Sequence, residues 1–170
     1  MKLLGIGKST PKQLNRAGAD QRVLLPFSAQ GISKRAFEAA IRMTLAEGGT
    51  LVPAFLARVP RTLPLDSPMP AACNLGMPLL EAIEQRASAL GIPVDARVSR
   101  GRTYRDALEK LLNEERYDRV VVSATDSPRQ GLSQDDLAWL LGNVSAEVMI
   151  LRPAPDDKRN ITAKGLRGYF

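Results

Sequence analysis

The sequence contains no histidine and a single cysteine, Cys73, among its 170 residues. Without histidine, the usual general base of serine and cysteine hydrolases is missing. With one cysteine and no histidine, a zinc site would need carboxylates for nearly all of its ligands, whereas zinc proteins rely on cysteine and histidine. The composition therefore excludes Ser-His-Asp hydrolases, zinc proteases and zinc fingers, and we expect no catalytic and no metal-binding residues.

Long apolar runs are also missing. No run approaches the roughly 18 residues that a membrane-spanning helix needs, and the opening apolar stretch, "LLGIG" at 3–7, is too short for a secretory signal. One cysteine cannot form a disulfide within the chain. These absences predict no membrane span and a cytoplasmic location.

Charge is concentrated at the two ends of the chain. Residues 1–22 carry five Lys or Arg against one Asp, and residues 152–170 carry five against two. Residues 23–151 have fourteen basic and fifteen acidic residues. We therefore expect a basic flexible arm at 1–21, a domain at 22–153 and a basic tail at 154–170. Such charges are usually solvated, and the alternatives are contact with RNA, anionic lipid or an acidic partner.

The glycines of "GIGKST" at 5–10 do not form a phosphate-binding loop. The P-loop pattern G-x-x-x-x-G-K-[ST] would place its first glycine at position 2, which is Lys2. There is also no room for a strand before it. The segment is better explained as part of the basic arm.

Apolar strands alternate with amphipathic helices through the middle of the chain. We expect five strands, at 22–27, 50–59, 94–100, 119–124 and 147–151, with Pro53 weakening the second and with Val94, Ala96 and Val98 pointing inward in the third. Helices are expected after Ser33, after a long proline-rich loop at 60–76, after Thr103 and after Ser133. Gly48 and Gly91 are expected to end the first two helices, and Pro153 the fold.

This alternation predicts a parallel sheet covered by helices on both faces, an α/β three-layer sandwich. In such sheets ligands bind beyond the carboxyl ends of the strands, where the connections part to opposite faces. The loops there are expected at 28–33, 100–103 and 125–133. Arg100, Arg102 and Arg105 could hold a phosphate at the second loop, or pair with carboxylates such as Asp106.

Three segments together resemble a universal stress protein domain over residues 22–153. They are "RVLLPFSAQGISKRAFEAA" at the first strand and helix, "SRGRTYRDALEKLLNEERYDRVVVSA" in the middle, and "LLGNVSAEVMILRP" at the end. The resemblance implies a five-stranded, mainly parallel sheet of the Rossmann type, like that of the adenine nucleotide hydrolases. It also implies a homodimer, joined through the last strand, Glu147–Leu151, which would otherwise be an open apolar edge.

The resemblance also implies where ATP would bind, and there the sequence departs from the family pattern. The ATP-binding branch has Asp after the first strand and G-x-x-G-x9-G-[ST] after the fourth. Here Ser28 replaces that Asp, and Ser123 and Asp126 replace the first two glycines. Gly142-Asn143 ends the motif, fifteen residues after Asp126 and ten after Gly131. The candidate nucleotide site, in degenerate form, comprises Ser28, Ser33, Ser123, Thr125, Asp126, Gly131, Gly142 and Asn143.

These departures weaken a nucleotide site. A Cβ obstructs the close approach of backbone to phosphate, and a carboxylate about 4 Å from a phosphate charge costs about 4 kcal/mol at a surface-like dielectric. We therefore expect no cofactor, with ATP as the alternative if Mg²⁺ bridges Asp126. The expected function is a non-catalytic binding or regulatory module that acts through protein partners. The alternatives are an ATP- or AMP-binding stress sensor and, less favoured, weak ATP hydrolysis.

Partners are expected at surfaces rather than in the crevice. The basic arm and tail are the leading candidates for docking a larger assembly, and nucleic acid is a weaker alternative because the central domain is almost neutral.

Overall fold

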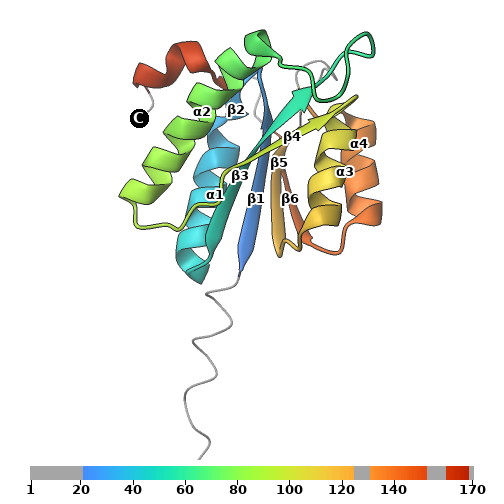
Figure 1. Ribbon diagram of the computed structural model, residues 1–170. Helices are drawn as coiled ribbons and strands as arrows, with labels where there is room; N and C mark the ends of the chain where they lie inside the picture. The colour runs from blue at the N-terminus through green and yellow to red at the C-terminus, as the bar shows by residue number, and fades with distance from the viewer. Residues whose placement is uncertain (1–20, 125–130, 153–159, 169–170) are drawn as a thin grey trace, which may run out of the picture.

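The computed structural model describes residues 21–124, 131–152 and 160–168, and its description is confined to them. Five parallel strands form one sheet in the order β4-β3-β1-β5-β6, and β2 pairs antiparallel with β7 in a second, two-stranded sheet (Figure 1). The elements are β1 (Arg22–Ser28), β2 (Ile32–Ser33), α1 (Lys34–Glu47), β3 (Thr50–Arg58), α2 (Pro70–Ala89), β4 (Arg97–Gly101), α3 (Tyr104–Glu114), β5 (Arg119–Ser123), α4 (Gln134–Asn143), β6 (Glu147–Leu151), β7 (Asn160–Ile161) and the 3-10 helix η1 (Ala163–Gly168).

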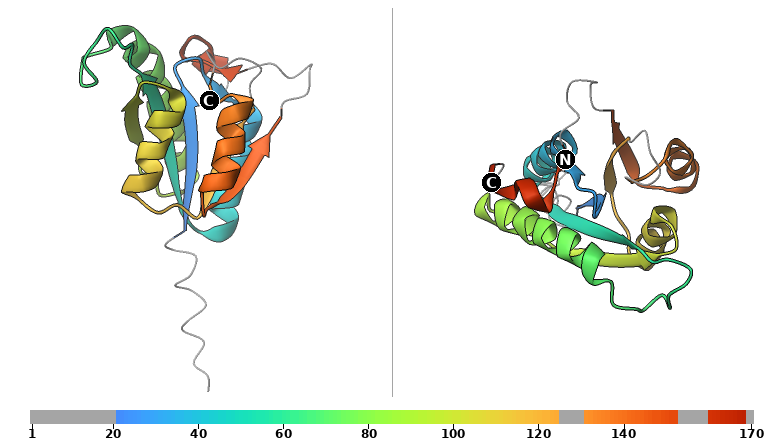
Figure 2. Two further views of the ribbon diagram at one scale, coloured as in Figure 1. Left: turned by 90° about the vertical axis from the view of Figure 1, so that its right-hand side faces the viewer. Right: turned by 90° about the horizontal axis from the view of Figure 1, so that it is seen from above.

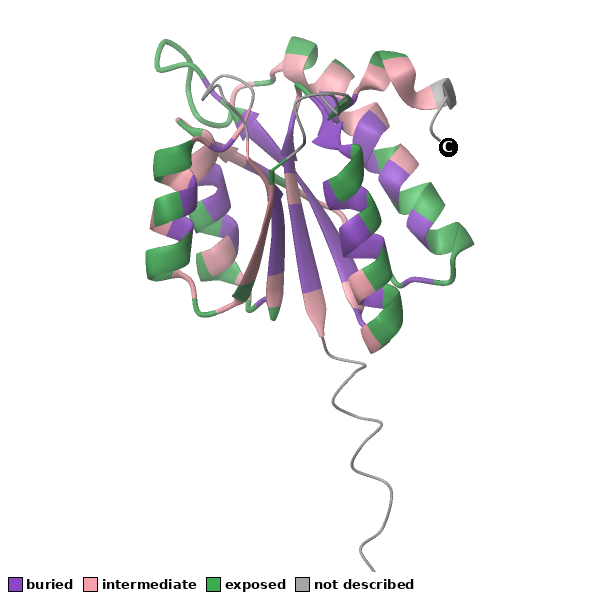
Figure 3. Cartoon of the chain, turned by 180° about the vertical axis from the view of Figure 1, so that it is seen from behind, coloured by how far each residue is buried: buried purple, intermediate pink, exposed green. Residues whose placement is uncertain are grey.

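Helices cover the sheet on both faces, so the predicted three-layer α/β sandwich is confirmed (Figure 2). Alternation along β1 shows how the layers form. Val23 and Leu25 pack in the core cluster with α1 and α2, whereas Leu24, between them, packs in the other cluster with α3 and α4. All three side chains are fully buried. Figure 3 shows the buried residues concentrated on the strands and on the inner faces of the helices.

Three of the four predicted helix starts are confirmed. Both predicted helix ends are confirmed as well, since Gly91, with a φ of 74°, directly follows the C-cap of α2 at Leu90. Ser33 caps α1, and Thr103 and Ser133 each form a capping box, with Asp106 and Asp136, at the starts of α3 and α4. Gly48 ends α1 in the left-handed conformation, with a φ of 63°. The S/T-x-x-D spacing identified the starts of α3 and α4, because the hydroxyl and the carboxylate each satisfy a backbone N–H that the helix leaves unpaired.

The long loop predicted over 60–76 is shorter in the structure. Helix α2 begins at Pro70, because proline at the first helical position loses no hydrogen bond there. Pro53 is likewise accommodated within β3. Leu51 bonds through its N–H to Pro93 and through its C=O to Asp95, in the segment just before β4, so Pro53, two residues on, faces the β4 side as well. The ladder to β4 begins only at Ala54, so no donor is required at Pro53.

The predicted inward alternation of the third strand holds only in part. Val94 and Ala96 pack against the core, but the side chain of Val98 is 44% exposed. Ser99 is buried instead, and its hydroxyl donates to the carbonyl of Ala107 at 2.8 Å. β4 is an edge strand, so the face that carries Val98 is left open at this position, while Ser99 on the other face is buried against α3.

The packed part of the chain does not end at Pro153. Residues 160–168, which the sequence analysis assigned to a basic tail, form β7 and η1. Ile161 is 1% exposed, and Leu166 packs against the core cluster of α1 and α2. Nothing in the local sequence signals this docking, because β7 pairs with residues almost the whole length of the domain away. Within the described ranges, no helix is long and apolar enough to cross a membrane.

Candidate functional site

The chain changes direction between β1 and β5, and this is where a parallel sheet offers a ligand crevice. Pairing between these strands is short, with only Val23↔Arg119 and Leu24↔Val120 in register. The carbonyl of Arg22 accepts from Asp118, so Pro26, four residues on, also faces β5. Proline has no N–H to donate there. The ladder therefore stops before the carboxyl ends, at the position where a ligand would enter between the two loops.

Ser28 ends β1, as the predicted site requires, but its hydroxyl is used locally. The residue is 3% exposed, its Oγ accepts from the N–H of Gln30 at 3.2 Å, and its carbonyl accepts from the N–H of Gly31 at 3.1 Å. This tight turn brings the chain back to β2, with a φ of 113° at Gly31. The serine that replaces the family's aspartate thus closes a turn beneath the surface.

Ser33 is the second predicted site residue on this side, and it too has a structural role. It is 7% exposed, and its Oγ accepts from the N–H of Ala36 at 3.4 Å, which caps α1. The structure therefore brings Ser28 and Ser33 together at the carboxyl end of the sheet. Both hydroxyls are buried and serve the local backbone.

The C-terminal segment, residues 160–168, lies directly on this loop. Ile161 stands opposite Ile32 and Asn160 opposite Ser33 in the β2–β7 pair. A Cβ at Gly31 would lie 2.5 Å from the carbonyl oxygen of Ile161, so the contact is tight enough to demand glycine. η1 continues beside α2 at the carboxyl end of the sheet (Figure 2). The segment, expected to be a tail, covers the β1 side of the crevice.

On the β5 side, the start of α4 is already capped by its own side chains. Ser133 donates its N–H to the carboxylate of Asp136 at 2.8 Å, and the N–H of Asp136 donates to the Ser133 hydroxyl at 3.2 Å. Asp135 adds a second carboxylate to this first turn. A helix N-terminus favours negative charge, and at α4 the negative charge comes from the protein's own aspartates rather than from a bound anion. Arg105 bonds to Asp136 at 2.8 Å rather than reaching into the crevice.

The remaining predicted site residues are not gathered into one place. Ser123 is half-buried at the end of β5, and Gly131 precedes α4, but Thr125 and Asp126 lie outside the described residues. Gly142 and Asn143 form the last turn of α4, at the amino end of the sheet. Asn143 is exposed, and its side chain donates to the carbonyl of Trp139 at 2.9 Å. The structure therefore separates the Gly-Asn pair from the carboxyl-end crevice.

The arginines of the second predicted loop, at 100–103, bond to backbone carbonyls of the protein. Arg102 donates to the carbonyls of Pro60 and Leu63 at 2.6 and 2.7 Å, and Arg100 donates to the carbonyl of Asp66 at 3.0 Å. Asp106 completes the α3 capping box instead of pairing with an arginine. Loop stabilisation thus explains these arginines without a phosphate.

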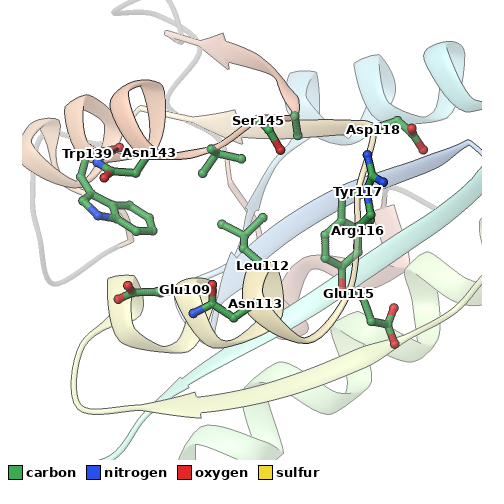
Figure 4. A pocket seen from close by; sticks show the side chains of 12 residues that line it. Glu109, Leu112, Asn113, Glu115, Arg116, Tyr117, Asp118, Trp139, Asn143 and Ser145 are labelled. Atoms are coloured by element: carbon green, nitrogen blue, oxygen red, sulfur yellow. Dashed lines mark hydrogen bonds between the residues drawn. The ribbon is translucent and has the colours of Figure 1, made fainter.

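A groove of about 410 Å³ lies at the opposite end of the sheet, between the ends of α3 and α4 (Figure 4). Glu109, Glu115 and Asp118 line it with Arg116, so its charge disfavours a phosphate. Beside it, Arg22 bonds to Asp95 and Glu115, both at 2.6 Å. Sequence reasoning missed this network because its members come from the ends of separate elements, with no common spacing.

Ionisation in the network follows from these contacts. Burial works to raise the pKa of the Asp95 carboxyl, but hydrogen bonds from Arg22 and Arg97 outweigh it and hold that pKa below its usual value. Burial, helped by the charge of Glu115, raises the pKa of the Tyr117 hydroxyl. These carboxylates are fixed by arginines, an arrangement that suits ion pairing rather than proton transfer. In the described ranges no cluster of side chains could hold a metal ion.

Solved structures that superpose on this chain include universal stress proteins. One, solved in complex with cAMP, superposes with a TM-score of 0.54 and 23% identity, covering 79% of this chain and 98% of that one. A family member from Burkholderia pseudomallei gives 0.57 and 14%, covering 77% and 95%. One from Arabidopsis thaliana, with AMP bound, gives 0.53 and 14%, covering 82% and 95%.

The chain has the universal stress protein fold. The resemblance seen in the sequence is thus confirmed at the level of fold, over 95 to 98% of the length of those structures. No family model matches the sequence, and no curated protein matches it either.

Proposed function

We propose that this chain is a universal-stress-protein-like binding module without catalysis, whose nucleotide crevice is closed in the form described. The observation that carries the proposal is Ser28, which is 3% exposed with its hydroxyl engaged in its own turn. A ligand at the carboxyl end of β1 would have to displace residues 160–168 to reach it. Function then moves from the crevice to the surfaces of the module.

The alternative is an adenine-nucleotide sensor, and the neighbours favour it, because two of them were solved with cAMP and with AMP. The negative charge at the start of α4 argues against this alternative when the ligand is a triphosphate. Asp135 and Asp136 lie in the first turn of α4, and among the described residues Arg105 is paired with Asp136. One like-charge contact at about 4 Å costs about 4 kcal/mol, roughly a thousandfold in affinity. The repulsion is smaller for a ligand that carries fewer negative charges.

Absence of catalysis is inferred from the sequence and from the ion pairs. The chain has no histidine to act as a base near neutral pH. Asp95 and Glu115 are both bound by Arg22 and Arg97. Both carboxylates are thus ion-pair partners of guanidinium groups and lie at the amino end of the sheet, away from the crevice.

A homodimer through β6 remains part of the proposal. β6 is an edge strand whose side chains are half-buried from Val148 to Leu151. Glu147 and Leu151 bond to the β5 side, so Val148 and Ile150 direct their backbone groups outward. Unpaired backbone and apolar side chains at one edge favour a second strand. The β6 strand of a second copy of this chain has the same open backbone groups and apolar side chains, so two copies could pair through it.

Partner docking through the basic arm also remains a proposal. Residues 1–20 lie outside the described residues, and they keep the excess of lysine and arginine found in the sequence. The tail no longer serves as a second free arm, because residues 160–168 pack against the domain. The lone Cys73 supports a cytoplasmic setting, which we retain as a prediction.

Isothermal titration calorimetry of the full chain tests this function. ATP, ADP and AMP would each be titrated with and without Mg²⁺, since Mg²⁺ could bridge a phosphate to a carboxylate. The proposal predicts no saturable binding below about 1 mM for any of the three. One site per chain with a Kd near 10 µM or tighter would establish the nucleotide sensor instead.

A further inference from the structure

The groove between α3 and α4 lies beside the point where the basic N-terminal arm joins the domain, and we propose that residues 10–17 of this arm bind in it. The inference goes beyond the proposed function, because it concerns the end of the sheet opposite the crevice and involves no nucleotide. It gives the arm a docking site on its own domain, and any partner of the arm would have to compete with that site.

The groove has an apolar floor and an acidic rim (Figure 4). On the rim, Glu109 lies near the middle of α3 and Asp118 lies just beyond the end of that helix, and both residues are exposed. The third carboxylate, that of Glu115, is already bonded to Arg22. The floor consists of side chains that are half-buried against the core cluster of α3 and α4, namely Leu112, Trp139, Val144 and Ala146.

The wall of the groove includes a hydroxyl that lacks a partner. Tyr117 is 7% exposed, and its hydroxyl has no hydrogen-bond partner among the described residues, although the guanidinium of Arg22 lies 5.7 Å from the centre of its ring. Buried hydroxyls are nearly always hydrogen-bonded, and this one can accept from an ammonium or guanidinium group. Carboxylates, aromatic rings and an unpaired acceptor together suit a segment with basic side chains.

The arm contains a segment whose pattern matches the groove. The stretch "TPKQLNRA" at 10–17 carries Lys12, Leu14 and Arg16 at every second position. In an extended chain such residues point the same way, and Lys12 and Arg16 would be about 13 Å apart. One face of the segment then presents a basic, an apolar and a basic side chain in turn. The groove presents the complementary order, with acidic residues on either side of an apolar floor.

The arm enters the domain at the edge of this groove. The N–H of Arg22 donates to the carboxylate of Asp118 at 2.7 Å. Arg16 precedes Arg22 by six residues, and six residues of extended chain span about 20 Å, which is enough for the chain to turn at Gly18 and lie along α3. In this direction Arg16 lies at Asp118, Leu14 at Leu112 and Lys12 at Glu109.

Charge and attachment both favour the arm as the occupant. Residues 1–20 carry four Lys or Arg against one Asp, whereas the groove is lined by three carboxylates and one arginine. A short tether holds the arm near the groove at an effective concentration on the order of 1 mM. An intrinsic Kd of about 1 mM is therefore tight enough for the arm to dock, so a few surface contacts suffice.

Fluorescence quenching of Trp139 in the full chain tests the inference, because Trp139 is the only tryptophan in the sequence and lines the groove. Acrylamide is uncharged, so its quenching constant measures how far the ring is covered. We expect Lys12→Glu and Glu109→Lys each to raise this constant roughly 1.5- to 2-fold, because each places like charges together and undocks the arm. Lys8→Glu makes the same charge change outside the docked segment and should alter nothing.

The decisive variant is the charge swap, Lys12→Glu combined with Glu109→Lys. It should return the quenching constant to the value of the unaltered chain, which a purely local effect of either substitution would not do. Glu109 is exposed, so we expect its substitution to leave the fold intact, and circular dichroism verifies this for every variant.

Three results would overturn the inference. The first is a quenching constant that Lys12→Glu leaves unchanged, and the second is a swap that does not restore protection. The third is protection that returns when the two single variants are mixed, since that would place the arm on a second copy. None of these measurements involves a nucleotide, so failure here is distinct from failure of the proposed function.

Discussion

Asp95 and Glu115 each accept hydrogen bonds from the same two arginines, Arg22 and Arg97, with N–O distances between 2.5 and 2.9 Å. The four side chains join the starts of β1 and β4 to the end of α3 at the amino end of the sheet. All are about a third exposed, so the ion pairs are screened in part by solvent. Their role is to hold the strand starts in place, at the end of the sheet opposite the crevice.

The first prediction at this scale is a pH dependence of stability. The folded-state pKa of Asp95 is below its usual value of about 3.9, so its stabilising contribution is present above that value and is lost as pH falls through the folded pKa. Asp95→Asn should cost roughly 1–2 kcal/mol at pH 7 and less at pH 3. Urea unfolding at pH 7, 5 and 3 measures this. Glu81→Gln, on the exposed side of α2, is the control and should show no such convergence. Equal losses at all three pH values would contradict the assignment.

The second prediction at this scale concerns Gly31. Its φ of 113° is rarely adopted by residues with a side chain, and its missing Cβ leaves room for the carbonyl of Ile161. Gly31→Ala should destabilise the protein by roughly 2–4 kcal/mol, since it combines backbone strain with a backbone clash. Gly91→Ala, at a φ of 74° in open space, bears the strain alone and should cost about 1–2 kcal/mol. Equal urea midpoints for the two variants would show that the segment over Gly31 yields freely.

At the scale of elements, the sequence predicted most accurately what depends on neighbouring residues. The caps at Ser33, Thr103 and Ser133 were found because a cap is a pattern of four residues. The start of α2 was not predicted, because the prolines before it were interpreted as loop. The exposure of Val98 was not predicted either, because the apolar alternation was extended into an edge strand. β7 was missed altogether, since its partner β2 is distant in sequence and both strands are two residues long.

The caps give a prediction of their own. Thr103→Ala removes the hydroxyl that accepts the N–H of Asp106 at 3.0 Å, and should lower the free energy of unfolding by about 1 kcal/mol. Thr103→Ser keeps the hydroxyl and is the matched control, with a loss of less than half as much. Urea midpoints of the two variants decide the matter. An alanine variant as stable as the serine variant would mean that the capping box contributes nothing to α3.

At the scale of the whole molecule, the fold was predictable and the site only partly so. Alternating strands and helices set the sheet and placed Ser28 and Ser33 at the crevice. Gly142 and Asn143 were placed there by analogy with a motif, but a ten-residue α4 carries them to the other end of the sheet. The packing of Ile161 over the crevice is a tertiary contact, and no local sequence pattern predicts it.

Assembly gives the prediction that belongs to this scale. Val148→Pro removes an N–H that faces away from β5, so it should leave the sheet intact while blocking a strand from adding to β6. Val148→Ala loses the same side-chain packing but keeps the N–H, and should remain a dimer. Sedimentation equilibrium of both variants and the unaltered chain measures the outcome. A Val148→Pro protein that is still dimeric, or an unaltered chain that is monomeric at high concentration, would rule out this interface.

A crystal structure of the full chain grown with excess AMP tests most directly the claim that the crevice is closed. It would show the crevice and residues 160–168 together. The account predicts β7 still paired with Ile32 and Ser33, and no nucleotide in contact with Ser28. An ordered AMP in contact with Ser28, with residues 160–168 in place or displaced, would contradict it.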